Sequence, residues 1–250
     1  MQFSVLTYNL LYNRATRQLK GILAENKPDL IFFQEMITKE EDLQAIESTG
    51  YKLADFSNSF IRRSGQIFGV ATFYNPKVFK AIRSRSFDLP AGILEALIFL
   101  LRRGEVPRTV LETEFELKDT KKKLVAYNIH LSAAAMNTVR QQQIVNTFHE
   151  LKLDKKYPII IAGDFNYPYH RKDFQGLINR HKLKEATKNL SFTSHFLKIR
   201  PLKLKLDYIL YKNLLSVETR RLDIKLSDHY PIFSSFRLKR KSDNNSTQTV

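Results

Sequence analysis

The chain of 250 residues contains no cysteine. It can therefore form no disulfide and carry out no thiolate chemistry, so any metal site must be built from oxygen and imidazole ligands. It also lacks a long apolar run, because the longest, at residues 92–101, is too short to span a bilayer and contains Glu95. The first residues show neither the basic region nor the apolar core of a secretory signal. We therefore expect a soluble, cytoplasmic protein.

Acidic residues are scarce relative to basic ones. The chain has 41 Lys+Arg against 25 Asp+Glu, a formal net charge of +16 at pH 7. Such an excess favours a polyanionic partner, either nucleic acid or the anionic face of a membrane, although a highly soluble surface would also explain it. The length suits one mixed α/β domain, which we place at residues 1–238. The polar segment 239–250 is expected to be disordered.

Apolar periodicity predicts many strands with few helices between them. Alternating or unbroken apolar runs predict strands at residues 2–9, 29–34, 67–74, 107–117, 123–131, 158–162, 206–211, 216–222 and 231–238. Apolar residues at helical spacing predict helices at about residues 15–27, 39–48, 136–151 and 171–181. This order favours sheets packed face to face with helices outside, rather than a repeated strand–helix–strand unit.

Polar residues stand at the ends of several of these apolar runs. The segments are TYN (7–9), FFQE (32–35), YNIH (127–130), AGDFN (162–166), LDYIL (206–210) and LSDHYPIFSSF (226–236). Polar residues placed repeatedly at strand ends indicate a site assembled along one edge of the core.

Two of these segments offer oxygen ligands. Glu35 ends a buried run, where a carboxylate needs water, arginine or a cation as its partner. Mg²⁺ suits it because this ion binds through one or two carboxylates and keeps several waters; a helix cap would explain Glu35 equally well. Asp164 and Asn166 would share one face of an extended chain and could bind water and phosphate, while an ordinary turn explains the same residues.

The histidines are candidates for proton transfer or phosphate contact. His229 follows Asp228 directly, and Asp207 is expected on an adjacent strand. A carboxylate that accepts from one ring nitrogen selects the histidine tautomer and favours the imidazolium, so we predict that Asp207 orients His229. His130 is a second imidazole at a strand end, a position that buried structural histidines also occupy.

Taken in order, the six segments resemble the endonuclease/exonuclease/phosphatase (DNase I-like) superfamily, over about residues 3–236. The resemblance implies an α/β fold, a four-layer α/β sandwich in which helices flank two central mixed β-sheets. It also implies cleavage of phosphate esters with Mg²⁺, for which Mn²⁺ could substitute. We expect a monomer.

The resemblance further implies roles for single residues. The metal would be bound by Glu35, Asn9 and Asp228. The catalytic residues would be His130, Asp164, Asn166, Asp207 and His229. In that scheme Asp164 aligns or deprotonates the attacking water, and His229 either contacts the phosphate or serves as the base. Arg108 and Arg140 are further candidates for binding the substrate. In-line attack on a phosphate ester needs charge neutralisation and an oriented water, which this set supplies.

Departures from the family pattern bear on the substrate. Abasic-site endonucleases carry a longer QETK-type motif, and a tyrosine where this chain has His130, so that subclass is disfavoured. DNase I-like enzymes pair this histidine with an acid from a preceding strand. The corresponding residues here, SGQI at 64–67, contain no carboxylate.

We therefore predict a Mg²⁺-dependent phosphodiesterase whose favoured substrate is nucleic acid. The alternative is a sphingomyelinase-type phospholipid phosphodiesterase, or a phosphatase, at an anionic membrane surface. For it, the apolar segment 89–101 followed by Arg102 and Arg103 would enter the membrane, although a packing helix explains that segment too. A non-catalytic scaffold is the third hypothesis, and the presence of every expected site residue argues against it.

Overall fold

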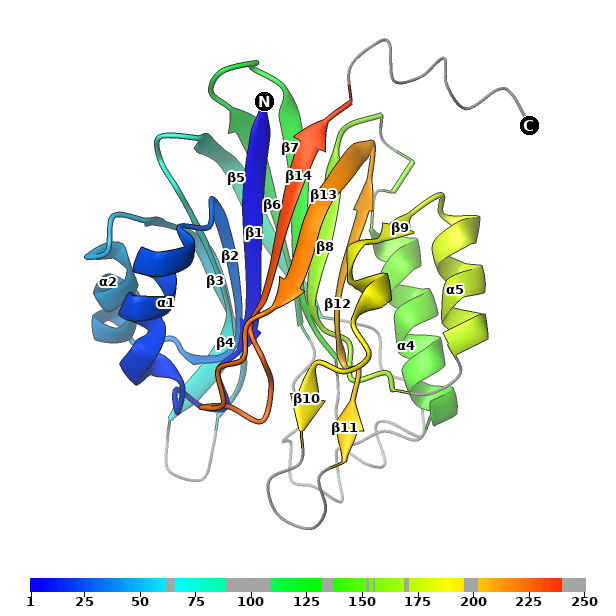
Figure 1. The fold of residues 1–250 in the computed structure, drawn as a ribbon, viewed down its shortest axis with the longest axis horizontal. Helices are drawn as coiled ribbons and strands as arrows, with labels where there is room; N and C mark the ends of the chain where they lie inside the picture. The colour runs from blue at the N-terminus through cyan, green and yellow to red at the C-terminus, as the bar shows by residue number, and fades with distance from the viewer. Residues whose placement is uncertain are drawn as a thin grey trace.

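The computed structural model describes residues 1–61, 66–88, 109–131, 137–151, 153–154, 156–168, 171–195 and 202–239. Arg108, the apolar segment 89–103 and the tail from residue 240 lie outside this part, as does the side chain of Arg140. Figure 1 shows two facing mixed sheets with helices on the outer side of each. The expected four-layer α/β sandwich is thus confirmed. None of the described helices has the length and apolar character needed to cross a bilayer.

The first sheet has six described strands in the order β13-β14-β1-β2-β4-β3. They are β1 (Gln2–Asn9), β2 (Leu30–Ile37), β3 (Lys52–Ile61), β4 (Ile67–Tyr74), β13 (Leu214–Arg221) and β14 (Ile232–Leu238). β1 and β2 are parallel, and the other pairs are antiparallel. The short helix η1 (Thr16–Gln18), α1 (Leu19–Asn26) and α2 (Glu40–Glu47) lie on its outer side (Figure 1).

The second sheet also has six described strands, in the order β5-β6-β7-β8-β12-β9. They are β5 (Phe79–Asp88), β6 (Thr109–Leu117), β7 (Lys123–His130), β8 (Ile159–Asp164), β12 (Asp207–Lys212) and β9 (Lys184–Glu185). Helices α4 (Asn137–Glu150) and α5 (Arg171–Arg180) lie outside it, and η2 (Ala186–Asn189) follows β9. A small hairpin of β10 (Ser194–His195) and β11 (Lys203–Leu204) lies at the lower end in Figure 1.

Strand alternation sorts the apolar side chains into three layers. In β8, Ile159 and Ile161 pack in the outer cluster with α4 and α5, whereas Ile160 and Ala162 pack between the sheets. Asp164 is the next residue of the inner row. The same alternation directs the polar ends of β1, β7 and β12 into the space between the sheets.

The pattern of apolar residues missed two long strands, β3 and β5, as well as the two-residue strands β9, β10 and β11, and it misplaced the end of β2. β3 and β5 are edge strands whose sequences, KLADFSNSFI and FKAIRSRSFD, mix charged and apolar residues, so their apolar signal is weak. β2 does not end at residue 34 but continues to Ile37 through an irregularity between Phe33 and Met36. Glu35 therefore lies within a strand, not after it.

Candidate active site

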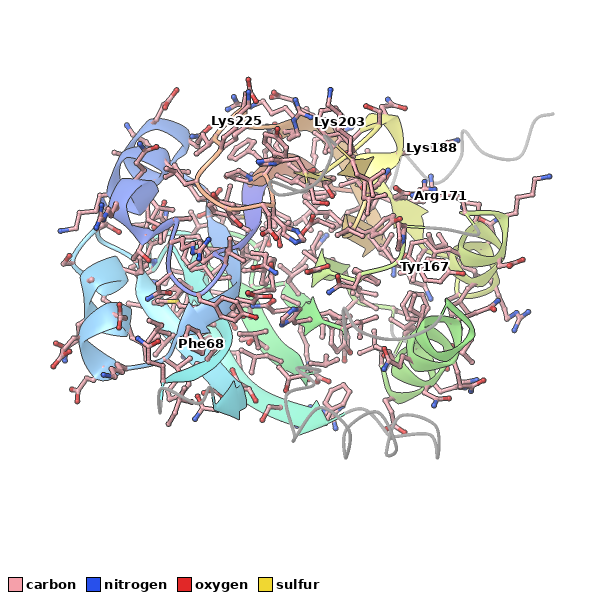
Figure 2. The ribbon with its side chains drawn as sticks, turned by 90° about the horizontal axis from the view of Figure 1, so that it is seen from below. Phe68, Tyr167, Arg171, Lys188, Lys203 and Lys225 are labelled. Atoms are coloured by element: carbon pink, nitrogen blue, oxygen red, sulfur yellow. The ribbon has the colours of Figure 1, made fainter. Side chains whose placement is uncertain are left out.

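The polar segments meet at one end of the sandwich, which Figure 2 views from below. Strand register explains the convergence. Asp164 pairs with both Asp207 and His130 across neighbouring strands. In the other sheet Asn9 pairs with Gln34, and β14 begins at Ile232 opposite Thr7. The loop before β14, which carries Asp228 and His229, is thereby brought to the same end.

Asn9 connects the carboxylates of the two sheets. Its Nδ2 donates to Asp164 Oδ2 at 3.0 Å and to Glu35 Oε1 at 3.3 Å. Its Oδ1 accepts from the Leu11 backbone N–H at 3.0 Å, which fixes the amide orientation. Asn9 thus faces the two carboxylates as a donor, and its role as a direct metal ligand stays a prediction.

Glu35 occupies a strained position in the bulge of β2. Its φ of 49° lies in the left-handed region, which is unfavourable for a residue with a side chain. Burial, reinforced by Asp164 and Asp228, raises the pKa of Glu35 to about 7, although His229 and Asn9 oppose the shift. Its Oε2 is buried without a hydrogen-bond partner among the described residues. A buried carboxylate oxygen without a partner is what a cation site requires.

A buried hydrogen-bond network secures the strand next to Glu35. Gln34 Nε2 donates to Asn128 Oδ1 at 2.8 Å, and Asn128 Nδ2 donates to the carbonyls of Phe33 and Ala71 at 3.1 and 3.0 Å. Gln34 and Asn128 are fully buried and belong to opposite sheets. They hold the bulge against the strand that carries His130. Our sequence reasoning assigned no role to either residue, although both lie in the segments FFQE and YNIH.

His229 is held by Asp207, which is held in turn by Thr193. Its Nδ1 lies 2.9 Å from Asp207 Oδ2 and 3.0 Å from Oδ1. The Thr193 hydroxyl donates to Asp207 Oδ2 at 2.7 Å and accepts from the backbone N–H of Asp207 at 3.0 Å. Burial alone would lower the pKa of His229, but Asp207 and Asp164 raise it well above its ordinary value. His229 is therefore an imidazolium at neutral pH.

His130 has the opposite electrostatics. Its Nε2 lies 3.7 Å from Glu35 Oε1 and 3.8 Å from Asp164 Oδ2. Burial lowers its pKa, so the ring is neutral at neutral pH. Its Nδ1 is buried without a partner among the described residues. This agrees with the lack of a carboxylate in the sequence at residues 64–67, of which 64 and 65 lie outside the described part.

Asp164 and Asn166 do not project from one extended segment. β8 ends at Asp164, and Asn166 has a φ of 49°. The Asn166 backbone N–H donates to Asp164 Oδ1 at 2.8 Å, and its Nδ2 donates to the Leu131 carbonyl at 2.8 Å. The turn that explains these residues structurally is thus present, and it places Asn166 beside the aspartate. Gly163, the residue before this turn, permits the close approach of β8 to β7, since a Cβ there would lie 2.0 Å from the Ile129 carbonyl oxygen.

In the part of the chain that the structure describes, two sets of residues could hold a cation. Asp164, Asp207 and His229 each offer one ligand atom, and these atoms lie within 4.8 Å of one another. However, Asp207 and the Nδ1 of His229 already form a hydrogen bond with each other, so these atoms are engaged. Glu35 has the unpartnered oxygen, and Asp228, whose side chain is 31% exposed, lies at the rim with Oδ1 4.0 Å from His229 Nε2. The donor chemistry therefore fits a hard divalent cation at Glu35.

The sequence model of the Endonuclease/Exonuclease/phosphatase family matches residues 6–229. The chain belongs to this family. It is therefore a hydrolytic phosphoesterase, of a kind that generally uses a divalent metal. No curated protein sequence matches the chain.

Several solved structures share this fold. The human nocturnin catalytic domain with bound sulfate is 20% identical, with a TM-score of 0.76, over 95% of this chain and 94% of that one. An endonuclease/exonuclease/phosphatase from Bacteroides vulgatus is 18% identical, with a TM-score of 0.73, over 96% and 100%. A mannosyl-6-phosphatase from Bacteroides thetaiotaomicron is 19% identical, with a TM-score of 0.65, over 94% and 99%. At these identities the likeness shows the fold alone.

Thr193 allows a test of how His229 is positioned. Thr193→Val keeps the shape but removes the hydroxyl that binds Asp207 and the N–H groups of Leu206 and Asp207. Leaving buried groups unpaired costs about 1–3 kcal/mol, so urea unfolding should show a loss of that size. Turnover should fall about tenfold, the equivalent of about 1.4 kcal/mol. Thr193→Ser should restore both. Equal turnover in the valine variant and the natural enzyme would show that the hydroxyl does not position the histidine.

Proposed function

We propose that the protein is a Mg²⁺-dependent phosphodiesterase that acts on nucleic acid, as a nuclease or a nucleic-acid-processing enzyme. The observation that carries the proposal is the continuous contact from Glu35 through His130 and Asp164 to His229, with steps of 3.7, 3.8 and 3.6 Å. It joins Glu35, whose Oε2 has no partner among the described residues, to an imidazolium within one buried site. The net charge of +16 favours a polyanionic substrate.

The residues that would hold the cation are Glu35 and, at the rim, Asp228, with Asn9 orienting the glutamate. A bound divalent ion would neutralise charge on a phosphoryl oxygen and polarise the phosphorus centre. Glu35 meets this need because its Oε2 has no other partner among the described residues.

The remaining residues would handle the water and the phosphate. Asp164 can accept a hydrogen bond from the attacking water, and Asn166 fixes the orientation of that carboxylate through its backbone N–H. His229, as an imidazolium, can donate from Nε2 to a phosphate oxygen while Asp207 holds Nδ1. Neutral His130 can donate a hydrogen bond without adding a second buried positive charge. Attack of the water oxygen on phosphorus then breaks the ester bond to the leaving oxygen.

The positive charge supports a polyanion rather than a small sugar phosphate. Lys203 and Lys225, both exposed, lie on the end of the molecule that carries the site (Figure 2). A chain of phosphates could contact several such groups at once, whereas a single phosphomonoester occupies only the catalytic centre. No described residue favours the membrane alternative, since its apolar segment lies outside the described part.

A substrate panel with Mg²⁺ tests the proposal. It should contain duplex and single-stranded DNA, RNA, sphingomyelin vesicles, inositol phosphates and a sugar phosphate. We expect hydrolysis of a polynucleotide, with an affinity that falls steeply with salt at a slope of about 0.7 per contacted phosphate for a single strand. Faster hydrolysis of sphingomyelin or of a phosphomonoester, with polynucleotides untouched, would overturn it. Polynucleotide affinity that stays flat from low to physiological salt would also count against it.

A further inference from the structure

A cluster of aromatic and cationic side chains lies beside the site. It consists of Phe192, His195, Lys203, Arg221 and Tyr230, which we call the aromatic clamp. Phe192 precedes Thr193, and Tyr230 follows His229. The clamp is thus built from the β10–β11 hairpin and the residues just before it, from the end of β13, and from the segment joining β13 to β14. It lies on the end of the molecule seen in Figure 2, where Lys203 is labelled.

Arg221 is the centre of the clamp. Its Cζ lies 3.9 Å from the ring centroid of Phe192 and 4.3 Å from that of Tyr230. The two rings stand edge to face, with centroids 5.7 Å apart and an interplanar angle of 73°. Stacking of this kind immobilises the planar guanidinium by cation–π contact while leaving its N–H donors available.

The guanidinium of Arg221 has no anionic partner among the described residues. Four other described arginines do pair with a glutamate: Arg83 with Glu114, Arg85 with Glu112, Arg171 with Glu185 and Arg220 with Glu218. Within the described ranges, no carboxylate or other acceptor binds the Arg221 guanidinium. Arg221 is only half-buried, so its donors can reach a ligand. A fixed fork of donors without an acid is suited to a phosphate group.

The clamp is directly connected to the catalytic residues. Tyr230 N–H donates to the Thr193 carbonyl at 2.8 Å, and His195 N–H donates to the Asp228 carbonyl at 2.8 Å. Arg221 Cζ stacks on the ring of Tyr230, the residue that follows His229 in the chain. The clamp therefore adjoins the catalytic histidine, on the side where a group next to the scissile phosphate could lie.

We propose that Arg221 binds a non-scissile phosphate of a polynucleotide lying across the site, so that the enzyme favours substrates with a second phosphate beside the one it cleaves. Lys203, with Nζ 4.7 Å from the Phe192 centroid, adds charge to the same subsite. Holding the arginine between two rings before binding reduces the entropy lost on binding. This inference rests on the proposed function and specifies how the site selects its substrate.

The test compares Arg221→Gln with Arg220→Gln. The control removes the same charge from the neighbouring residue, whose guanidinium contacts Phe233, Glu218 and Asn26 instead. For a single-stranded oligonucleotide, Arg221→Gln should raise KM about tenfold with kcat changed less than about threefold, and should reduce the salt slope of binding by about 0.7. On thymidine 5′-(p-nitrophenyl phosphate), which carries only the scissile phosphate, it should match the natural enzyme. Arg220→Gln should change none of these.

Two further variants keep the test decisive. Arg221→Lys retains the positive charge but not the planar set of N–H donors. It should keep the salt slope of binding while raising KM for the oligonucleotide about threefold. Phe192→Leu loosens the arginine and should raise KM for the oligonucleotide alone. If the natural enzyme cleaves oligonucleotides and the Arg221 variants share its KM and salt slope, the clamp inference is wrong and the proposed function stands. If the natural enzyme neither binds nor cleaves oligonucleotides but hydrolyses other phosphate esters, the proposed function is wrong, and the clamp inference, which rests on it, is wrong too.

Discussion

Replacing Glu35 with glutamine is expected to lower kcat by about a thousandfold or more and to abolish stabilisation by Mg²⁺. The variant keeps the side-chain shape but removes the charge that Oε2 would need to bind the proposed cation. Losing one strong electrostatic contact to a phosphoryl transition state costs about 10²–10³ in rate, and losing the cation itself costs several kcal/mol more. Turnover on the best substrate of the panel, together with titration calorimetry of Mg²⁺, measures both effects.

The stability of the metal-free protein provides a second measurement on the same variant. The pKa of Glu35 is about 7 in the folded chain and near 4.5 in an unfolded one. The folded state therefore holds the proton more tightly, so stability is present at low pH and is lost as the pH rises through this interval. The loss is about 3 kcal/mol between pH 4 and pH 8. Glu35→Gln does not titrate and should not show this component.

Mg²⁺ should reverse the loss only in the natural chain. A ligand that binds the folded state at about a hundred times its Kd adds about 2.7 kcal/mol. Glu112→Gln is the matched control, because Glu112 is also buried but pairs with Arg85 away from the site. It should keep kcat within about twofold and keep the response to Mg²⁺. Full Mg²⁺ stabilisation of Glu35→Gln would place the cation elsewhere, with the group of Asp164, Asp207 and His229 as the next candidate.

The position of the site could be predicted from the sequence because strand alternation is a local rule. An inner row of apolar residues that ends in a polar one, as Ala162 does before Asp164, directs that polar residue into the space between the sheets. Antiparallel pairing of β8 with β12 then brings Asp207 opposite Asp164. These relations depend only on the two-residue alternation of side chains within a strand and on the order of the strands along the chain.

The features that were missed depend on contacts between distant segments. The bulge that turns Glu35 inward has no sequence signal of its own, and Gln34 and Asn128 hold it from opposite sheets. Thr193 lies in a segment with no apolar period, and its role appears only once Asp207 is beside it. The role of Arg221 was missed for the same reason. It stacks on Phe192, which lies 29 residues earlier in the chain, and on Tyr230, which lies on the far side of a loop. Side-chain contacts of this range cannot be read from periodicity.

Asp207→Asn should lower kcat about a hundredfold near pH 8 and move the loss of activity at high pH to a lower pH. Burial lowers the pKa of His229, and Asp207 is the largest influence that raises it. With asparagine in its place the imidazolium loses its proton at lower pH. A donor to phosphate must be protonated, so activity is present below the pKa of His229 and disappears as the pH rises through it. The pH dependence of kcat for the natural enzyme and the variant measures the shift.

The same experiment decides which role His229 has. If His229 were the general base, it would work only when neutral, so activity would disappear as the pH falls, and Asp207→Asn would extend activity to lower pH instead. His229→Ala should lose about 10²–10³ in kcat at every pH, the range for one transition-state donor. The double variant should be no slower than His229→Ala, because Asp207 acts through the histidine and the two effects are not additive. His149→Ala, an exposed histidine on α4, should leave the profile unchanged. An additive double variant would mean that Asp207 contributes separately, as it would if it were itself a cation ligand.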